Sequence, residues 1–201
     1  MEVNPYLSPA ARDILSRAEI GIAGAGGLGS NCAMHLVRSG IRRLVIADFD
    51  RVAGSNLNRQ FFFADQVGMK KVEALGANLR RIAPELELVL LDLEVTAGNA
   101  AGLFGACDVV VEAFDSGAAK QMLIRTMTAA GKTVVAASGL GGWGRSNAFH
   151  LRRMAGGKLY VAGDFESGVG DGALEPFSPR VGIAAAMEAN TVIALLLGEE
   201  P

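Results

Sequence analysis

Short apolar runs alternate with longer amphipathic stretches over the first two-thirds of the chain. Each apolar run is too short for a helix and is bounded by glycine or polar residues, which is typical of a buried strand. We expect strands at residues 19–23, 44–47, 86–91, 109–111 and 133–137. The stretches around them have helical periodicity, which predicts helices at residues 9–17, 28–39, 65–83, 96–104 and 117–130.

The pattern changes after residue 138, where glycine and polar residues become frequent. Residues 147–152 and 159–162 predict short antiparallel strands, and an apolar helix is expected at residues 179–197. Strands that alternate with crossover helices indicate an α/β fold. The sequence therefore predicts a Rossmann-like doubly wound sheet, mostly parallel, with antiparallel strands at the C-terminal end. Because we find no repeat and no linker, residues 1–201 form a single predicted domain.

The composition is that of a soluble globular protein: 50% of the residues are hydrophobic, 20% are charged, and the formal net charge is −2. This balance gives no reason to expect a nucleic acid or an anionic membrane as a partner. The apolar stretch 181–197 contains Glu188 and Asn190, so a buried or interface helix explains it better than a membrane span. The first residues lack the basic-then-apolar pattern of a signal peptide.

Two cysteines, Cys32 and Cys107, lie in apolar stretches and are expected in the core. This count gives no disulfide framework, so a cytoplasmic location is expected. Together with the two histidines, the cysteines cannot provide a four-ligand zinc site of the usual spacing.

Positive charge is concentrated between residues 38 and 81, where nine Lys/Arg accompany four Asp/Glu. The simpler interpretation is a set of solvated helix and strand ends. The other is a local field that attracts a polyanion such as a nucleotide triphosphate.

A glycine-rich turn follows the first predicted strand, and it contains Gly24, Gly26, Gly27 and Gly29. A strand, a G-x-G-x-x-G turn and a helix together present backbone N–H groups and a positive helix end to a phosphate. The motif fits any Rossmann nucleotide binder, and an NAD-dependent oxidoreductase is one such alternative. A tight turn that binds nothing is the structural alternative.

Asp48 stands at the end of the second predicted strand, about 20 residues after the glycine turn. At this position an acidic side chain can accept hydrogen bonds from ribose hydroxyls. Asp50 can face the same side of an extended segment, or it can cap the next turn. We favour Asp48 as the ribose ligand.

Four polar residues that a dehydrogenase does not need come next, namely Asn56, Arg59, Gln60 and Lys71. An arginine offers a planar fork to phosphate oxygens, a lysine offers a compact charge, and amides donate without adding charge. This set favours ATP over NAD as the ligand. The structural alternatives are a salt bridge for Arg59 and a solvated helix position for Lys71.

Together these motifs resemble a known family. The segments GAGGLGS, DFDRVAGSNLNRQ, VGMKKV and the AFD that ends at Asp115 are similar to the ThiF/MoeB/HesA family, the bacterial relatives of ubiquitin-activating enzymes. The resemblance covers nearly the whole chain, and the segments AFDSGAAK, AASGLGGWG and PRVGIAAAMEAN are most similar to the short ThiF-like branch. It implies adenylation of the C-terminal glycine of a ubiquitin-fold sulfur carrier, with ATP and Mg²⁺.

The resemblance also implies roles for single residues. Asn56, Arg59, Gln60 and Lys71 would contact the triphosphate, and Asp115 would bind Mg²⁺. Asp115 follows the predicted strand 109–111, at the carboxyl edge where doubly wound sheets bind ligands. One protein carboxylate suffices when phosphates supply the other oxygens. The alternative for Asp115 is the N-cap of the next helix.

The implied partner is a ThiS-like carrier that ends in Gly-Gly, and thiamine biosynthesis is the expected pathway. A homodimer is expected because relatives are often dimers. Residues 139–144 and 163–175 either frame a channel for the slender tail or are plain surface loops. Longer relatives donate an arginine to the triphosphate from the neighbouring subunit, and Arg12 and Arg17 are the candidates here, in a context that matches poorly.

Two departures from the family pattern limit the expected chemistry. Many relatives carry two CxxC pairs for zinc, and this chain has none. Some relatives form a covalent bond to the carrier through a cysteine before the last helix, but residues 142–180 contain no cysteine. The resemblance therefore supports acyl-adenylation and not a thioester step on this protein.

Two further functions stay open beside carrier adenylation. Some relatives adenylate a carboxylate on a modified tRNA nucleoside, which would call for an extended basic surface. The net charge of −2 argues against it. A nucleotide-binding scaffold without catalysis is the other, and the joint presence of Arg59, Lys71 and Asp115 argues against that.

Overall fold

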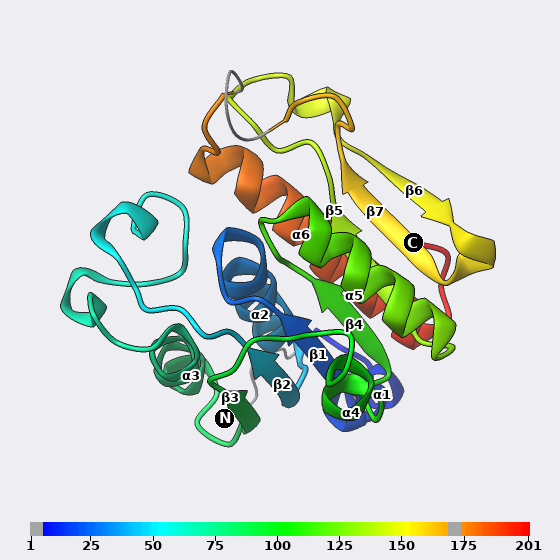
Figure 1. Ribbon diagram of the computed structural model, residues 1–201. Helices are drawn as coiled ribbons and strands as arrows, with labels where there is room; N and C mark the ends of the chain where they lie inside the picture. Colours follow the sequence, from blue (N-terminus) through cyan, green and yellow to red (C-terminus); the bar gives the residue numbers. More distant parts are fainter. Residues whose placement is uncertain (1–5, 169–173) are drawn as a thin grey trace.

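A single sheet organises the molecule (Figure 1), and the computed structural model describes residues 6–168 and 174–201. The strand order is β3-β2-β1-β4-β5-β7-β6. The strands are β1 (Glu19–Ala23), β2 (Arg43–Ala47), β3 (Glu87–Leu91), β4 (Val109–Glu112), β5 (Thr133–Ala137), β6 (His150–Met154) and β7 (Leu159–Gly163). Every neighbouring pair is parallel except β6–β7, so the predicted doubly wound sheet with an antiparallel C-terminal end is confirmed.

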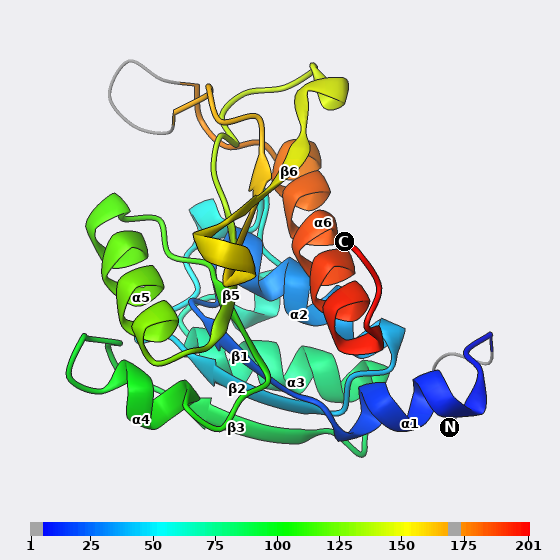
Figure 2. The ribbon, with the colours of Figure 1, turned by 90° about the vertical axis from the view of Figure 1, so that its right-hand side faces the viewer.

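Helices cover both faces of the sheet. They are α1 (Pro9–Arg17), α2 (Gly27–Ser39), α3 (Lys71–Ile82), α4 (Ala100–Phe104), α5 (Gly117–Ala129) and α6 (Ser178–Leu197). Figure 2 shows α4 and α5 on one side of the sheet and α2 and α6 on the other. The central strands β1, β2, β4, β5 and β7 are apolar and buried on both faces because helices pack against each face, which gives two hydrophobic clusters. The edge strands β3 and β6 are more exposed. Cys32 lies in one cluster and Cys107 in the other, as predicted.

The strand order reverses at the centre of the sheet. β1 pairs with β2 on one side and with β4 on the other. The chain therefore runs outward from β1 to β3, returns to β4, and then runs outward in the opposite direction. A crevice opens at the carboxyl ends of strands at such a switch point, and ligands of doubly wound sheets bind there.

The predicted helix 65–83 is wrong at its beginning. Residues 64–66 form a 3₁₀ turn, and α3 starts only at Lys71. Gly68 has a φ of +92°, and Lys70 forms an isolated β-bridge with Arg51, so the chain is extended just before the helix. This correction matters for function because it puts Lys71 in the first turn of α3.

The last helix, α6, packs against α2, β5 and β7. By length and composition it is the one described helix that could cross a membrane, but much of it is buried inside the protein, as the core helix of a globular fold is. Its centre carries Glu188, which is fully buried, and neither carboxylate oxygen has a hydrogen-bond partner among the described residues. Burial raises the pKa of Glu188 well above its ordinary value, and it also raises the pKa of the Cys32 thiol.

We predict that Glu188→Gln reduces the pH dependence of stability. The folded-state pKa of Glu188 is raised, so its stabilising contribution is complete below the unfolded pKa, about 4.3, and is lost as pH rises towards the folded pKa. In that window the free energy of unfolding should fall by on the order of 1 kcal/mol per pH unit in the wild type, and less in the variant. Urea unfolding at several pH values measures both slopes. Equal slopes would show that Glu188 ionises normally.

Candidate functional site

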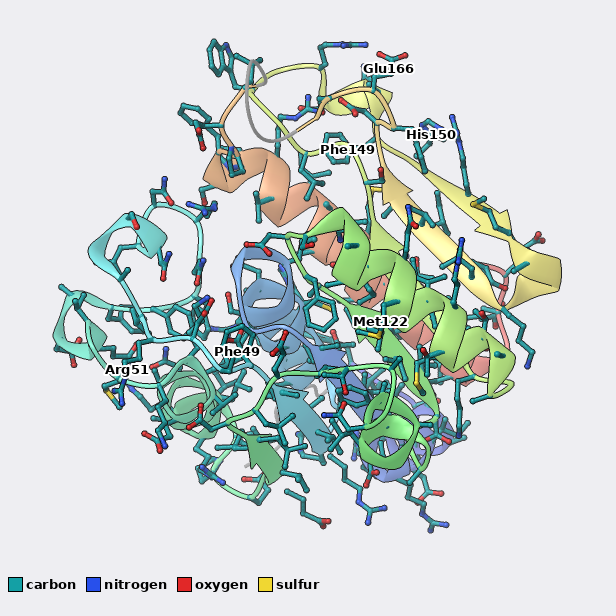
Figure 3. The ribbon with its side chains drawn as sticks, viewed as in Figure 1. Phe49, Arg51, Met122, Phe149, His150 and Glu166 are labelled. Carbon is teal, nitrogen blue, oxygen red and sulfur yellow. The ribbon has the colours of Figure 1, made fainter. Side chains whose placement is uncertain are left out.

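A cleft of about 610 Å³ opens at the carboxyl ends of the strands. The segments that follow β1 to β5 and β7 line it, together with residues from α3 and the start of α6. In Figure 3, Phe49 after β2 and Glu166 after β7, which both line the cleft, belong to opposite parts of the molecule. The volume of the cleft is in the range of small-molecule and cofactor pockets.

Two steric requirements shape the glycine turn between β1 and α2. Gly24 has a φ of +102°, and a Cβ there would lie 2.8 Å from the carbonyl oxygen of Ala113. A Cβ on Gly29 would lie 1.9 Å from the carbonyl oxygen of Gly24. Only glycine lets α2 begin this close to the turn. Gly24 lines the cleft, whereas Gly29 acts by letting the turn close.

Gly26 and Gly27 also line the cleft. A Cβ on Gly26 would meet nothing closer than the amide nitrogen of Gln60, at 3.9 Å. Gly27 abuts α6, because a Cβ built there would lie 3.1 Å from Cγ1 of Val181. Since α2 begins at Gly27, the free N–H groups and the positive end of this helix are available to an anion in the cleft.

Asp48 connects the glycine turn with the segment after β2. Its Oδ2 accepts a hydrogen bond from the backbone N–H of Ala25 at 2.7 Å, and its Oδ1 accepts one from Asp50 at 2.8 Å. A carboxylate offers about four lone-pair sites, so two remain for another ligand. Asp48 lines the cleft and can therefore hold the turn and accept from ribose hydroxyls at once.

Lys71 is buried and lines the cleft, so the solvated alternative is wrong. Its Nζ lies 2.7 Å from Oδ2 of Asp50, whose side chain is half exposed. The backbone N–H of Lys71 also donates to the carbonyl of Asp50, at 2.9 Å. Sequence analysis missed this role of Asp50, although Asp48 and Asp50 alternate on an extended segment that faces the site. The ion pair of Asp50 and Lys71 therefore places a single ammonium group at the cleft.

Arg59 lines the cleft without a carboxylate partner among the described residues, so its structural salt bridge is not found. Its Nη1 donates to Oδ1 of Asn58 at 2.7 Å and to the carbonyl of Ser55 at 3.3 Å. The loop that carries it is tied to α2, because Nδ2 of Asn31 donates to the carbonyl of Arg59 at 2.9 Å. The same nitrogen donates to the carbonyl of Gly27, within α2, at 2.7 Å. Sequence analysis missed Asn31, because only the folded chain brings these segments together.

Asn56 and Gln60 flank Arg59 but do not line the cleft. The Oδ1 of Asn56 accepts from the backbone N–H of Ala53 at 2.9 Å, so this side chain caps the short turn before Arg59. The Oε1 of Gln60 is buried and has no partner in the described chain. A buried acceptor without a partner is unusual, but Gln60 does not line the cleft, so nothing in the structure connects this oxygen with a ligand there.

Asp115 is exposed at the cleft, between β4 and α5. The N-cap of α5 is Ser116, whose Oγ accepts from the N–H of Ala119, so the capping alternative for Asp115 is wrong. Lys120, which also lines the cleft, pairs with the buried Glu112 at 2.9 Å. Burial raises the pKa of Glu112, and Lys120 opposes this shift. The Asp115 carboxylate therefore remains available to a cation.

We call the two sides of the cleft the near wall and the far wall. The near wall comprises residues 24, 26–28 and 47–50 with Arg59 and Lys71, and the far wall comprises residues 138–140, 165–168, 175 and 176. Both expected channel loops contribute to the far wall, although residues 169–173 lie outside the described chain.

The two candidate arginines lie on α1, away from the cleft of their own chain. Arg17 pairs with Asp13 at 2.9 Å, and Nη2 of Arg12 donates to the carbonyl of Leu7. Their role in a second subunit stays a prediction.

Comparison with known proteins identifies the family. The profile described as "ThiF family" matches residues 3–201, nearly the whole chain. The chain belongs to the ThiF family. The resemblance carried by the glycine turn and the SNLNRQ segment is therefore confirmed.

Curated relatives of this ThiF-family chain are larger proteins. The adenylyltransferase and sulfurtransferase MOCS3 of Aedes aegypti is 29% identical over 192 residues, which are 92% of this chain and 43% of the relative. The adenylyltransferase and sulfurtransferase UBA4 of Eremothecium gossypii is 30% identical over 185 residues, 92% of this chain and 39% of the relative. The chain thus spans less than half the length of these curated relatives.

Solved structures share the fold. The tRNA N6-threonylcarbamoyladenosine dehydratase TcdA of E. coli, in complex with ATP, gives a TM-score of 0.85 at 23% identity and covers 94% of this chain and 90% of that chain. E. coli MccB, solved with AMPCPP and MccA, gives a TM-score of 0.74 at 20% identity and covers 92% of this chain and 57% of that chain. At these identities the likeness establishes the ThiF-type fold alone.

We predict that Asn31→Ala loosens the loop that carries Arg59. The variant loses the hydrogen bond that ties the carbonyl of Arg59 to α2, and also a bond to Gly27 within α2. We expect a loss of about 1–2 kcal/mol in the free energy of unfolding. Hydrogen exchange should rise in residues 53–62. The matched control is Asn190→Ala, an exposed asparagine within α6. Unchanged exchange in residues 53–62 would contradict the role assigned to Asn31.

Proposed function

We propose that this protein uses ATP to adenylate a carboxylate, and that the carboxylate is the C-terminal glycine of a ubiquitin-fold sulfur carrier. One observation supports this most: the glycine turn, Asp48, Arg59, Lys71 and Asp115 all line one cleft. An NAD-dependent enzyme needs the glycine turn and Asp48, but it has no use for Arg59, Lys71 and Asp115. The family membership of the whole chain supports the same conclusion.

The reaction forms one bond and breaks one. A carboxylate oxygen of the carrier attacks the α-phosphorus of ATP, the bond to the bridging oxygen breaks, and pyrophosphate leaves with its electrons. No proton transfer is needed, so the protein must mainly align two anions and neutralise charge. Arg59 can hold phosphate oxygens in a bidentate manner, and Lys71 can place a compact charge beside the reacting phosphate.

The near wall suits the nucleotide. Asp48 would accept from the ribose hydroxyls, and the N–H groups at the start of α2 would bind phosphate oxygens. Asp50 holds the Nζ of Lys71 in place, since the two side chains already pair at 2.7 Å. Mg²⁺, held by Asp115 and phosphate oxygens, would add positive charge at the triphosphate.

The far wall remains for the carboxylate substrate. Much of it is glycine-rich backbone, including Gly139 and Gly168, which suits an extended tail without side chains. A ThiS-like carrier that ends in Gly-Gly has such a tail, and the resemblance to the short ThiF-like branch favours thiamine biosynthesis in the cytoplasm. We also propose a homodimer, in which Arg12 or Arg17 of one subunit reaches the other.

A second candidate substrate is a carboxylate on a modified tRNA nucleoside. It is favoured by the fold comparison, because the dehydratase TcdA matches 94% of this chain and 90% of its own length. The larger MccB matches over 57% of its length. The formal net charge of −2 favours the protein carrier.

ATP–pyrophosphate exchange separates these candidates. Exchange that depends on a Gly-Gly carrier, and disappears when its last glycine is removed, supports our proposal. Exchange that depends on tRNA and falls steeply with salt concentration identifies the nucleoside substrate instead. ATP binding without exchange for either substrate would identify a nucleotide-binding scaffold.

We predict that Arg59→Ala and Lys71→Ala each lower the exchange rate by at least about 100-fold, as expected when a donor to the transition state is lost. Lys70→Ala is the matched control: this neighbouring lysine pairs with Asp92 and does not line the cleft. Near-normal exchange in the Lys71 variant would contradict the assigned triphosphate site.

A further inference from the structure

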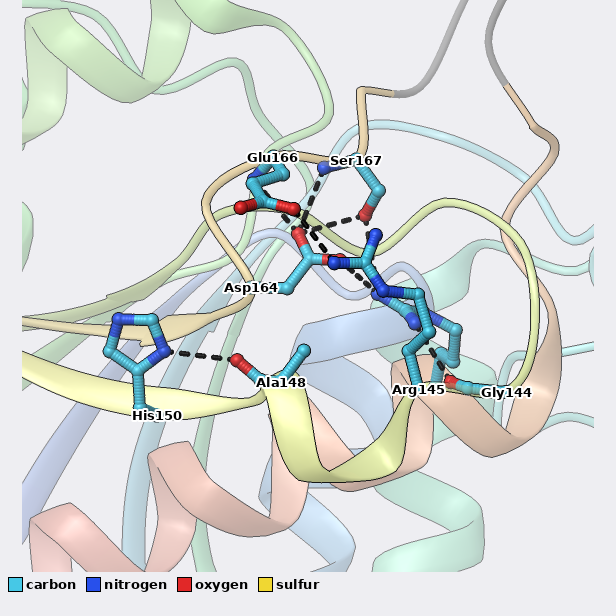
Figure 4. Close-up of polar contacts among 8 residues, drawn as sticks. Gly144, Arg145, Ala148, His150, Asp164, Glu166 and Ser167 are labelled. Atoms are coloured by element: carbon cyan, nitrogen blue, oxygen red, sulfur yellow. Dashed lines mark hydrogen bonds and ion pairs between the residues drawn. The ribbon is translucent and has the colours of Figure 1, made fainter.

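A buried ion pair lies behind the far wall, outside the set of residues assigned so far. Asp164 follows β7 and is 4% exposed, and Arg180, in the first turn of α6, is 2% exposed. Their side chains are in direct contact through Nη2 of Arg180 and Oδ2 of Asp164. Figure 4 shows Asp164 beside Ser167 and Glu166 of the turn that follows it. No step of the proposed chemistry uses either residue. The desolvation cost of burying both charges, and their place behind the far wall, therefore need another explanation.

Asp164 folds the chain that follows it into a tight turn. Its Oδ1 accepts hydrogen bonds from the backbone N–H groups of Glu166 and Ser167, each at 2.9 Å, and from the Ser167 hydroxyl at 3.0 Å. Burial acts to raise the pKa of Asp164, but these bonds and Arg180 outweigh it and lower the pKa to about 2. The carboxylate therefore stays charged at every pH at which the protein is expected to work.

Arg180 joins three segments that are distant in sequence. Its Nη1 donates to the carbonyl of Gly144 at 2.9 Å, and its Nη2 donates to the Ser167 hydroxyl at 3.2 Å in addition to Asp164. Its guanidinium carbon also lies 4.7 Å from the centre of the Phe149 ring. The guanidinium of Arg180, at the start of α6, thus contacts both the loop after β5 and the turn after β7.

The turn held in this way is strained and closely packed. Phe165 has a φ of +62°, a conformation that costs free energy for a residue with a side chain. A Cβ on Gly139 would lie 2.1 Å from Oδ1 of Asp164 and 2.4 Å from the nitrogen of Phe165. On the β6 side, the Phe165 ring is covered by Arg152, at 3.8 Å, and by His150, at 4.8 Å. The surrounding contacts therefore fix the position of this turn.

A buried ion pair is weak evidence for stability, because desolvation of two charges can exceed their attraction. It does fix the position of the segments that carry it, since neither side chain can move without leaving a buried charge unpaired. Here the fixed element is residues 165–168, which line the far wall. The near wall is held by other bonds, those of Asp48 and Asn31.

We propose that Arg180 is a positioning residue, which with Asp164 and Ser167 sets the far wall and thereby the affinity for the carboxylate-bearing tail. This inference rests on the proposed function, because it assigns the far wall to the second substrate. Loosening the pair should weaken binding of the carrier and leave ATP binding intact. A purely structural role would change both equally, or neither.

Two variants of different severity test the inference. Arg180→Lys keeps a positive charge beside Asp164 but loses the planar fork that reaches Gly144 and Ser167. Ser167→Ala removes a single hydroxyl and leaves the ion pair in place. Arg43→Ala is the matched control. Arg43 pairs with Glu87 at 3.1 Å where β2 and β3 begin, at the opposite end of the strands from the cleft. Thermal unfolding identifies variants that no longer fold.

We expect the KM for a Gly-Gly carrier in the exchange assay to rise about tenfold in Arg180→Lys and about threefold in Ser167→Ala, as for weakened hydrogen bonds to a charged group. The Kd for ATP should stay within about twofold, and hydrogen exchange should rise at residues 164–168 in both variants. The control should show neither change.

Three results would overturn the inference in separate ways. Equal losses in the Kd for ATP and the KM for carrier would make the ion pair purely structural. Unchanged kinetics in a folded Ser167→Ala and Arg180→Lys would show that the far wall does not bind the tail. Wild-type protein without carrier-dependent exchange would reject the proposed function itself, and this inference with it.

Discussion

The carboxylate of Asp48 is the interaction on which the near wall depends. It accepts from Ala25 in the glycine turn and from Asp50 in the segment after β2, so it joins the loops of two adjacent strands at one point. Asp50 in turn holds Lys71 through both its side chain and its carbonyl. One acidic side chain thus positions the glycine turn and a buried ammonium group, and it keeps free lone pairs for a ligand.

The two walls of the cleft are built by different means. The near wall uses short hydrogen bonds between neighbouring loops, and its charges stay accessible to a ligand. The far wall is held by the buried ion pair of Arg180 and Asp164. These two residues fix the position of the wall, and neither of them lines the cleft. A charged nucleotide needs exposed donors, whereas a tail without side chains needs only a fixed shape.

Sequence patterns predicted most of the fold, because buried parallel strands are continuous apolar runs whose carboxyl ends meet at one edge of the sheet. That rule predicted Asp48 and Asp115 at one cleft, whereas Lys71 was expected there from the resemblance to the family, and all three line it. It could not reveal Asn31 or the pairing of Asp164 with Arg180, since these contacts join loops that have no periodicity and lie far apart in sequence. The misplaced start of α3 has a similar cause: helical spacing continues through residues that the β-bridge of Lys70 keeps extended.

The first turn of α6 contacts both walls. Arg180 holds the turn after β7, and the next residue, Val181, abuts Gly27 in the glycine turn. A rotation of this whole helical turn would therefore reach both walls, because two consecutive residues contact them, whereas loosening of Arg180 alone would reach only the far wall. Any coupling through it must be reciprocal: a ligand on one side changes affinity on the other by the same factor in each direction.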